Sequence, residues 1–84
     1  MFNIIIQPDA EKDLKKLEKN ISEIILKKIF SIKETPLHYV EHLTGSPLWK
    51  LRIGDYRAIL HINFKNKSIN VVKVGHRKNI YEKI

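Results

Sequence analysis

The residues with the clearest chemical potential are the three arginines, Arg52, Arg57 and Arg77, which all lie in the second half of the chain. A guanidinium keeps its positive charge and offers a planar set of donors that matches the oxygen atoms of a phosphate group. Lys50 precedes the first arginine by two residues, and Tyr81 follows the last by four. Cationic side chains gathered in this way indicate a site that holds an anion.

Two of the arginines belong to neighbouring strands of a predicted hairpin. Gly54-Asp55 separates two runs rich in β-branched and aromatic residues, and such a connection is typical of a tight turn because Gly adopts positive φ without strain. The turn would pair Arg52 with Arg57 and bring Lys50 onto the same face, since side chains alternate between the faces of a strand. Like charges directly opposite each other destabilise a sheet, so we expect this cluster to be kept for binding an anion.

The alternate positions of the same two strands are apolar and should face the core. A third strand over residues 69–75 follows a polar break at residues 65–68. His61 shares a face with Arg57, and we expect it to be a structural histidine rather than a metal ligand. The residues predicted to form the core side are Trp49, Leu51, Ile53, Tyr56, Ala58, Leu60, Ile62 and Phe64.

The first half of the chain predicts one strand and two helices. Residues 2–7 form a short apolar run that ends at Pro8, and proline is suited to the first turn of a helix. Apolar residues at helical spacing continue to about Asn20 and again over residues 22–33, which predicts an αα-hairpin lying across the sheet. Residues 35–47 contain two prolines and a glycine and should form a connecting loop.

These elements predict a single domain over residues 1–84 with an α+β fold. We expect a mostly antiparallel four-stranded sheet with the N-terminal αα-hairpin packed on one face, in the order β-α-α-β-β-β. Residues 77–84 should add a short C-terminal helix or tail. A chain of 84 residues supplies one modest core and not two.

Composition restricts the functions of the domain. The net charge is +7, and residues 48–84 carry nine Lys or Arg against two acids, which indicates nucleic acid or an acidic protein as a partner. The chain has no cysteine, and His38 and His42 form a weak donor set, so we expect neither a metal nor another cofactor. We find no signal-peptide pattern and no apolar run of membrane-spanning length, so we expect a cytoplasmic protein with no membrane partner.

Two motifs and the order of the elements resemble the RelE/ParE toxin superfamily over essentially the whole chain. The first motif is the turn Gly54-Asp55-Tyr56-Arg57, and the second is Gly75-His76-Arg77-Lys78-Asn79-Ile80-Tyr81. The resemblance implies a RelE-like fold and the toxin half of a type II toxin–antitoxin pair. In this superfamily the RelE branch cleaves messenger RNA in the ribosomal decoding site, whereas the ParE branch inhibits DNA gyrase.

The resemblance also implies roles for individual residues. The sheet arginine of the RelE branch falls on Arg57, its arginine after the last strand on Arg77, its tyrosine on Tyr81 and one of its sheet lysines on Lys50. Leu48 stands where some members have a second lysine, and the spacing from Arg77 to Tyr81 is shorter than in some members. Both departures bear on how efficiently the protein would cleave RNA.

For a ribonuclease of this kind the chemistry is attack by the 2′-OH of the RNA itself, without a metal. Arg57 and Arg77 would grip the scissile phosphate, because fixed donors aimed at developing charge stabilise a transition state. Lys50 would serve as the base, since its cationic neighbours favour its neutral form. Tyr81 would either stack on a base or donate a proton, and His76 is a second candidate acid. The residues expected to bind RNA or phosphate around them are Arg52, Lys73, His76 and Lys78.

The resemblance implies three partners: a RelB-like antitoxin, the ribosome with its messenger RNA, and operator DNA reached through the antitoxin. We therefore expect an endoribonuclease that cleaves messenger RNA in the ribosomal A site and so inhibits translation. Two alternatives stay open. One is a ParE-like gyrase inhibitor without enzymatic activity, and the other is a catalytically inactive RNA-binding or interaction module.

Overall fold

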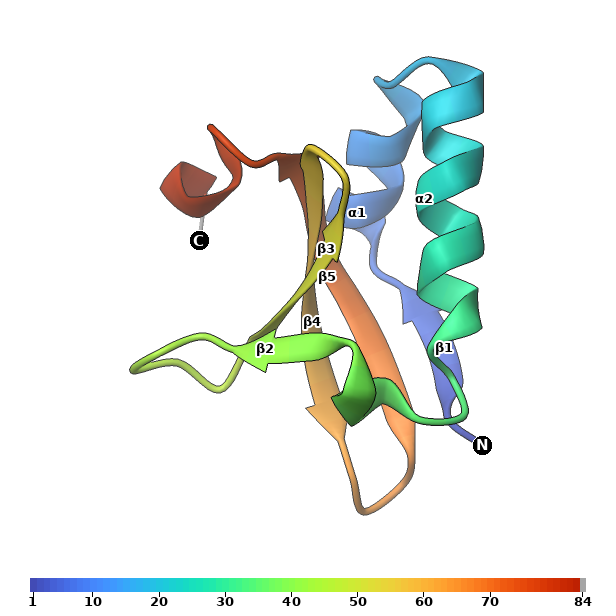
Figure 1. The fold of residues 1–84 in the computed structure, drawn as a ribbon, viewed down its shortest axis with the longest axis vertical. Helices are drawn as coiled ribbons and strands as arrows, with labels where there is room; N and C mark the ends of the chain where they lie inside the picture. Colours follow the sequence, from blue (N-terminus) through green and yellow to red (C-terminus); the bar gives the residue numbers. More distant parts are fainter. Residues whose placement is uncertain (84) are drawn as a thin grey trace.

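The computed structural model describes residues 1–83 and places two helices on one side of a five-stranded sheet (Figure 1). The strands lie in the order β1-β5-β4-β3-β2, with β1 parallel to β5 and the other neighbouring pairs antiparallel. The helices and strands are β1 (Asn3–Ile6), α1 (Pro8–Lys15), α2 (Lys19–Ser31), β2 (Val40–His42), β3 (Trp49–Ile53), β4 (Tyr56–Asn63) and β5 (Ser68–His76), with two 3₁₀ turns, η1 (Pro36–His38) and η2 (Ile80–Lys83).

The α+β fold expected from the sequence is confirmed, with one correction to the sheet. The segment predicted as a loop, residues 35–47, contains β2, so the sheet has five strands rather than four, and the parallel β1 makes it mixed. The sequence pattern hides β2 because this strand has only three residues and lies between two prolines. The predicted C-terminal helix is present as η2 up to Lys83, and Ile84 lies outside the described residues.

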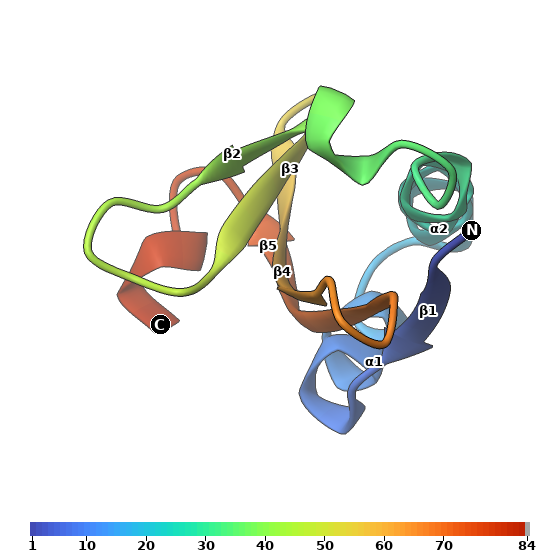
Figure 2. The same cartoon turned by 90° about the horizontal axis from the view of Figure 1, so that it is seen from below.

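The helical hairpin follows from its end signals and from an apolar stripe. α1 begins at Pro8, which has no N–H to leave unpaired, and Asp9 and Glu11 complement the positive end of the helix. Figure 2 shows both helices on one side of β4 and β5, and the C-terminal turn on the other side. α2 and the residue that caps it bury one isoleucine per turn against the sheet: Ile25, Ile29 and Ile32.

Every second side chain of β3 and β4 faces the helices and contributes to the core, as predicted. Leu51, Ala58 and Leu60 are buried in one cluster with residues of both helices. The prediction is wrong for Phe64, whose side chain is 49% exposed. β4 ends at Asn63, so Phe64 already lies in the turn, where the alternation of a strand no longer holds.

A β-bulge interrupts the ladder between β4 and β5. Ile59 lies opposite Lys73, but the next residue of β4 lies opposite Val71, so Val72 has no partner in β4. Because of this extra residue, Asn70 and Lys73 both point to the sheet face turned away from the helices, although they are three positions apart. This face is hereafter the open face, and it carries the cations that the sequence singles out.

Asp13 ties α1 to the edge of β5, and its removal should destabilise the fold. Its Oδ2 atom accepts a hydrogen bond from the N–H of Val74 at 3.0 Å, beyond the stretch of β5 that pairs with β1. Asp13→Ala should lower the free energy of unfolding by about 1–3 kcal/mol, because a partly buried N–H loses its acceptor. Urea unfolding measures the change. Glu23→Ala, on the exposed surface of α2, is the control and should stay within about 0.5 kcal/mol. An equal loss in both variants would contradict the role of Asp13.

Candidate functional site: the basic cluster on the open face

The β3–β4 hairpin places like charges side by side on the open face, as its two-residue turn predicts. Arg52 lies opposite Arg57, and Lys50 lies opposite Ile59 two residues further along. Gly54 has a φ of +60°, the left-handed conformation that such a turn requires. Lys50, Arg52 and Arg57 form what we call the basic cluster.

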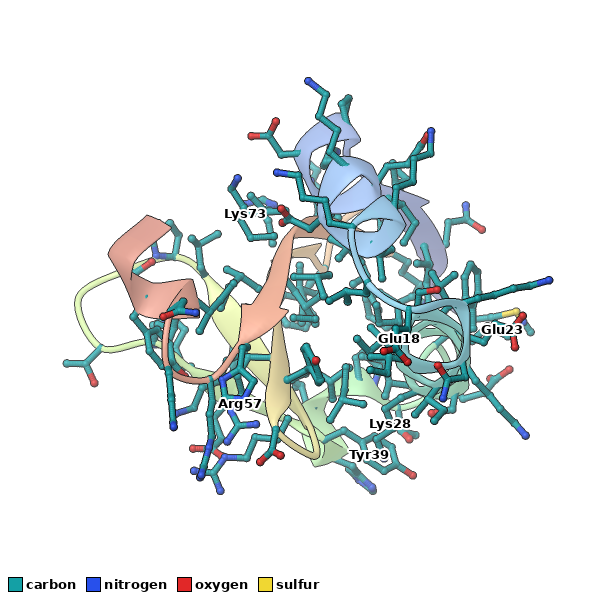
Figure 3. The ribbon with its side chains drawn as sticks, turned by 90° about the horizontal axis from the view of Figure 1, so that it is seen from above. Glu18, Glu23, Lys28, Tyr39, Arg57 and Lys73 are labelled. Atoms are coloured by element: carbon teal, nitrogen blue, oxygen red, sulfur yellow. The ribbon has the colours of Figure 1, made fainter. Side chains whose placement is uncertain are left out.

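The guanidinium of Arg57 is held by backbone carbonyls rather than by an acid. Its Nη1 atom donates to the carbonyl oxygens of Gly54 and Tyr56, at 2.7 and 2.8 Å. These bonds fix the side chain over the turn, on the side of the sheet away from α2 (Figure 3). Among the side chains that the structure describes, no carboxylate pairs with Arg57 and no acceptor takes its Nε and Nη2 hydrogens, so three N–H groups stay available to a ligand.

Glu41 on β2 joins the cluster, although the sequence pattern does not reveal it. It lies opposite Lys50 in the sheet, and its carboxylate is 3.8 Å from Lys50 Nζ and 3.4 Å from Arg52 Nε. This acid offsets part of the repulsion between the cations. Lys50 therefore has a carboxylate beside it as well as cations.

Arg77 reaches the same hairpin turn from the end of β5. Its backbone N–H donates to the carbonyl oxygen of Asp55 at 2.8 Å, and its Nε atom lies 3.6 Å from Asp55 Oδ1. Arg57 is bonded to Gly54, the neighbouring residue of the turn. The two arginines that the sequence proposes for phosphate binding are thus anchored at one turn.

The C-terminal turn folds back over the open face and brings Tyr81 to the basic cluster. Ile80 is fully buried, and a Cβ atom on Gly75 would lie only 3.0 Å from its Cδ1 atom, so the glycine leaves room for it. Ile59, which points to the same face, is also fully buried. The ring of Tyr81 lies with its centroid 5.8 Å from Lys50 Nζ, within the range of a cation–π contact.

Three other predicted residues lie apart from the cluster. His76 is opposite Tyr56, packs edge-on against its ring at 5.5 Å, and therefore points to the helix side of the sheet. Its Nδ1 atom accepts the N–H of Lys78, which is exposed in the turn after β5. Lys73 is on the open face, but its Nζ atom lies 3.6 Å from Asp9 Oδ2 at the start of α1. Figure 3 shows Lys73 beside α1 and away from Arg57.

The described part of the chain contains no group of three His, Cys, Asp or Glu side chains arranged to hold a metal. His38 and His42, four positions apart, lie on η1 and β2 rather than on one helix. His42 packs instead against Trp49, with ring centroids 4.7 Å apart. Neither helix within residues 1–83 is long and apolar enough to cross a membrane.

The family of the chain is shown by a match over nearly its whole length. Residues 4–81 match the model of the family described as the ParE toxin of the type II toxin–antitoxin system parDE. The chain belongs to this family and is a toxin of the RelE/ParE superfamily, which confirms the resemblance of its two motifs. No curated protein matches the chain.

Solved structures of RelE toxins share the fold. The RelBE2 toxin–antitoxin complex of Mycobacterium tuberculosis is 23% identical, with a TM-score of 0.85 over 90% of this chain and 98% of that one. The RelE–RelB complex of Pyrococcus horikoshii is 28% identical, with a TM-score of 0.76 over 90% and 94% of the two chains. The RelBE complex of E. coli is 25% identical, with a TM-score of 0.74 over 90% and 96%.

Ile80 should determine whether the C-terminal turn stays on the sheet. Ile80→Ala should lower the free energy of unfolding by about 2–5 kcal/mol, because it empties a buried position, and should speed cleavage by chymotrypsin after Tyr81. Urea unfolding and timed digestion with mass spectrometry measure the two effects. Ile24→Ala is the matched control, since Ile24 is 60% exposed on α2. If the two variants are equally stable and equally resistant, Ile80 does not hold the turn.

Proposed function

We propose that this toxin is a ribosome-dependent endoribonuclease, which cleaves messenger RNA in the ribosomal A site and thereby inhibits translation. One observation carries the proposal: Arg57 and Arg77 are anchored at one turn, beside a lysine and a tyrosine that contact each other. RNA presents a phosphate at every nucleotide. A cluster of this kind supplies the charge-assisted donors that phosphate oxygens accept.

The proposed reaction is an internal transesterification. The 2′ oxygen attacks the adjacent phosphorus, the bond to the 5′ oxygen of the next nucleotide breaks, and a 2′,3′-cyclic phosphate forms. The available N–H groups of Arg57 would bind the non-bridging oxygens, and Arg77 would add a second guanidinium. The loss of one such donor from an active site typically lowers the rate by about 10²–10³-fold.

Two groups are candidates to accept the proton of the 2′-OH, namely Lys50 and Glu41. The carboxylate of Glu41 is 3.8 Å from Lys50 Nζ, so both groups lie at one point of the cluster. A carboxylate accepts a proton without first losing one, so we assign the role to Glu41. Tyr81 is 43% exposed beside Lys50, where it can stack on a base or give a proton to the leaving 5′ oxygen.

We infer that the protein is paired with a RelB-like antitoxin. The similar structures from M. tuberculosis, P. horikoshii and E. coli are toxin–antitoxin complexes. An antitoxin that covers the basic cluster with acidic segments would keep it from the ribosome, and the pair would reach operator DNA through the antitoxin. Release of the antitoxin would then free the cluster for RNA.

Gyrase inhibition is the second candidate, because the family model that matches is that of the ParE toxin. A toxin that only binds gyrase needs no donors aimed at a scissile phosphate. A DNA supercoiling assay separates the two functions. Inhibition of gyrase by the antitoxin-free protein, without any cut in messenger RNA, would establish the second candidate in place of the first.

Loss of either anchored arginine should strongly slow messenger cleavage. Arg57→Ala and Arg77→Ala should each lower the cleavage rate by about 100-fold or more, because each removes a donor from the phosphate. Primer extension on a defined message measures this, and the unchanged protein should cut only when ribosomes are present, within the A-site codon. Lys65→Ala, at an exposed position between β4 and β5, is the charge-matched control and should cleave normally.

The same assay tests the assignment of the base. Glu41→Gln should lose cleavage while the protein still binds RNA, whereas normal cleavage by this variant would return the role to Lys50. Full cleavage by the double variant Arg57→Ala/Arg77→Ala would overturn the proposed mechanism.

A further inference from the structure

A shallow hollow of about 530 Å³ lies on the open face, beyond the basic cluster and outside the residues assigned so far. His61 lies in it and shares a face of β4 with Arg57, four residues away, which corresponds to about 13 Å along a strand. A single RNA strand bound by its phosphate at Arg57 can therefore reach the hollow with a neighbouring nucleotide. The hollow is lined by Gln7, Pro8, Asp9, His61, Asn70 and Val72.

Two amide side chains are already oriented within the hollow. The Nε2 atom of Gln7 donates to Oδ1 of Asn70 at 2.8 Å. This bond leaves the Oε1 atom of Gln7 as an acceptor and the Nδ2 group of Asn70 as a donor. Amide acceptors and donors of Asn and Gln are groups that proteins use to bind the edge of a nucleobase.

The other walls suit the flat faces of a base. His61 lies directly opposite Asn70 in the sheet and is exposed, so its imidazole ring offers a surface for stacking. Pro8 and Val72 add apolar walls. Val72 is the extra residue of the β-bulge.

The charges at the rim favour a base over a second phosphate. Asp9 lines the hollow, and its carboxylate would repel a phosphate group but accept a hydrogen bond from an exocyclic amine. The ammonium group of Lys73 lies 3.6 Å from that carboxylate, which offsets the negative charge of Asp9. An occupant with an amino group on its edge thus fits better than an anion.

We propose that this hollow binds one unpaired nucleobase of the RNA that carries an exocyclic amine, next to the phosphate held by the basic cluster. This proposal rests on the proposed function, which supplies RNA as the ligand. It adds to that function a site that determines base specificity. His61 stacks on the base, and Gln7 and Asn70 read its edge. Adenine, cytosine and guanine carry the required amine, and uracil does not.

NMR titration of the ¹⁵N-labelled, antitoxin-free protein tests this site without relying on cleavage. The probes are a single-stranded RNA pentamer with a central adenine and an all-uracil pentamer. The adenine pentamer should shift the side-chain amide signals of Gln7 and Asn70, and the all-uracil pentamer should bind about 10-fold more weakly. His61→Ala should weaken binding of the adenine pentamer by about 10-fold, because it removes one stacking partner.

The controls separate the site from the proposed function. His38→Ala removes an exposed histidine that does not line the hollow and should bind as the unchanged protein does. Shifts confined to the basic cluster, or equal affinity for the two pentamers, would overturn the base site and leave messenger cleavage standing. Shifts in the hollow from a protein that cuts no message on ribosomes would overturn the cleavage proposal and leave the base site standing.

Discussion

The opposition of Arg52 and Arg57 across the β3–β4 hairpin is the constraint around which the open face is arranged. Two like charges directly opposite each other destabilise a sheet, by about 0.2–1 kcal/mol for a pair of this kind. Two contacts reduce the repulsion between these arginines. Glu41 approaches the Arg52 side of the pair, whereas Arg57 is turned onto carbonyl oxygens of the tight turn. Carbonyls orient a guanidinium without neutralising its charge, so Arg57 keeps its attraction for an anion.

The other residues of the site, Arg77 and Tyr81, come from the C-terminal segment, which lies against this hairpin. The turn that holds Arg57 also holds Arg77 through Asp55, so one short loop orients both guanidinium groups. Beyond it, Ile80 is buried on the open face over Gly75, separate from the main core between sheet and helices. Burial of an isoleucine typically stabilises by about 1.5–3 kcal/mol, and here that free energy positions Tyr81 beside the cluster. A partner that displaced this turn would therefore dismantle the site while leaving the main core intact.

Much of this arrangement could be predicted from the sequence, and the failures have physical reasons. A two-residue turn fixes the register of its hairpin, so Gly54-Asp55 alone determines which cations face each other. β2 could not be predicted, because three residues between prolines show no period, and the role of Glu41 was hidden with it. Alternation from Gly75 does place His76 on the helix side, so that signal was present in the sequence. The bulge at Val72 gives no such signal in the sequence, and this extra residue brings Asn70 onto the open face.

The most direct test of the anion site is the salt dependence of binding to single-stranded RNA. Each phosphate contact contributes about 0.7 to the slope of log K against log salt for a single strand. The account predicts that Arg57→Ala reduces this slope by about 0.7 relative to the unchanged protein, and that the Lys65→Ala control leaves the slope unchanged. An unchanged slope in Arg57→Ala would contradict the claim that this arginine binds phosphate.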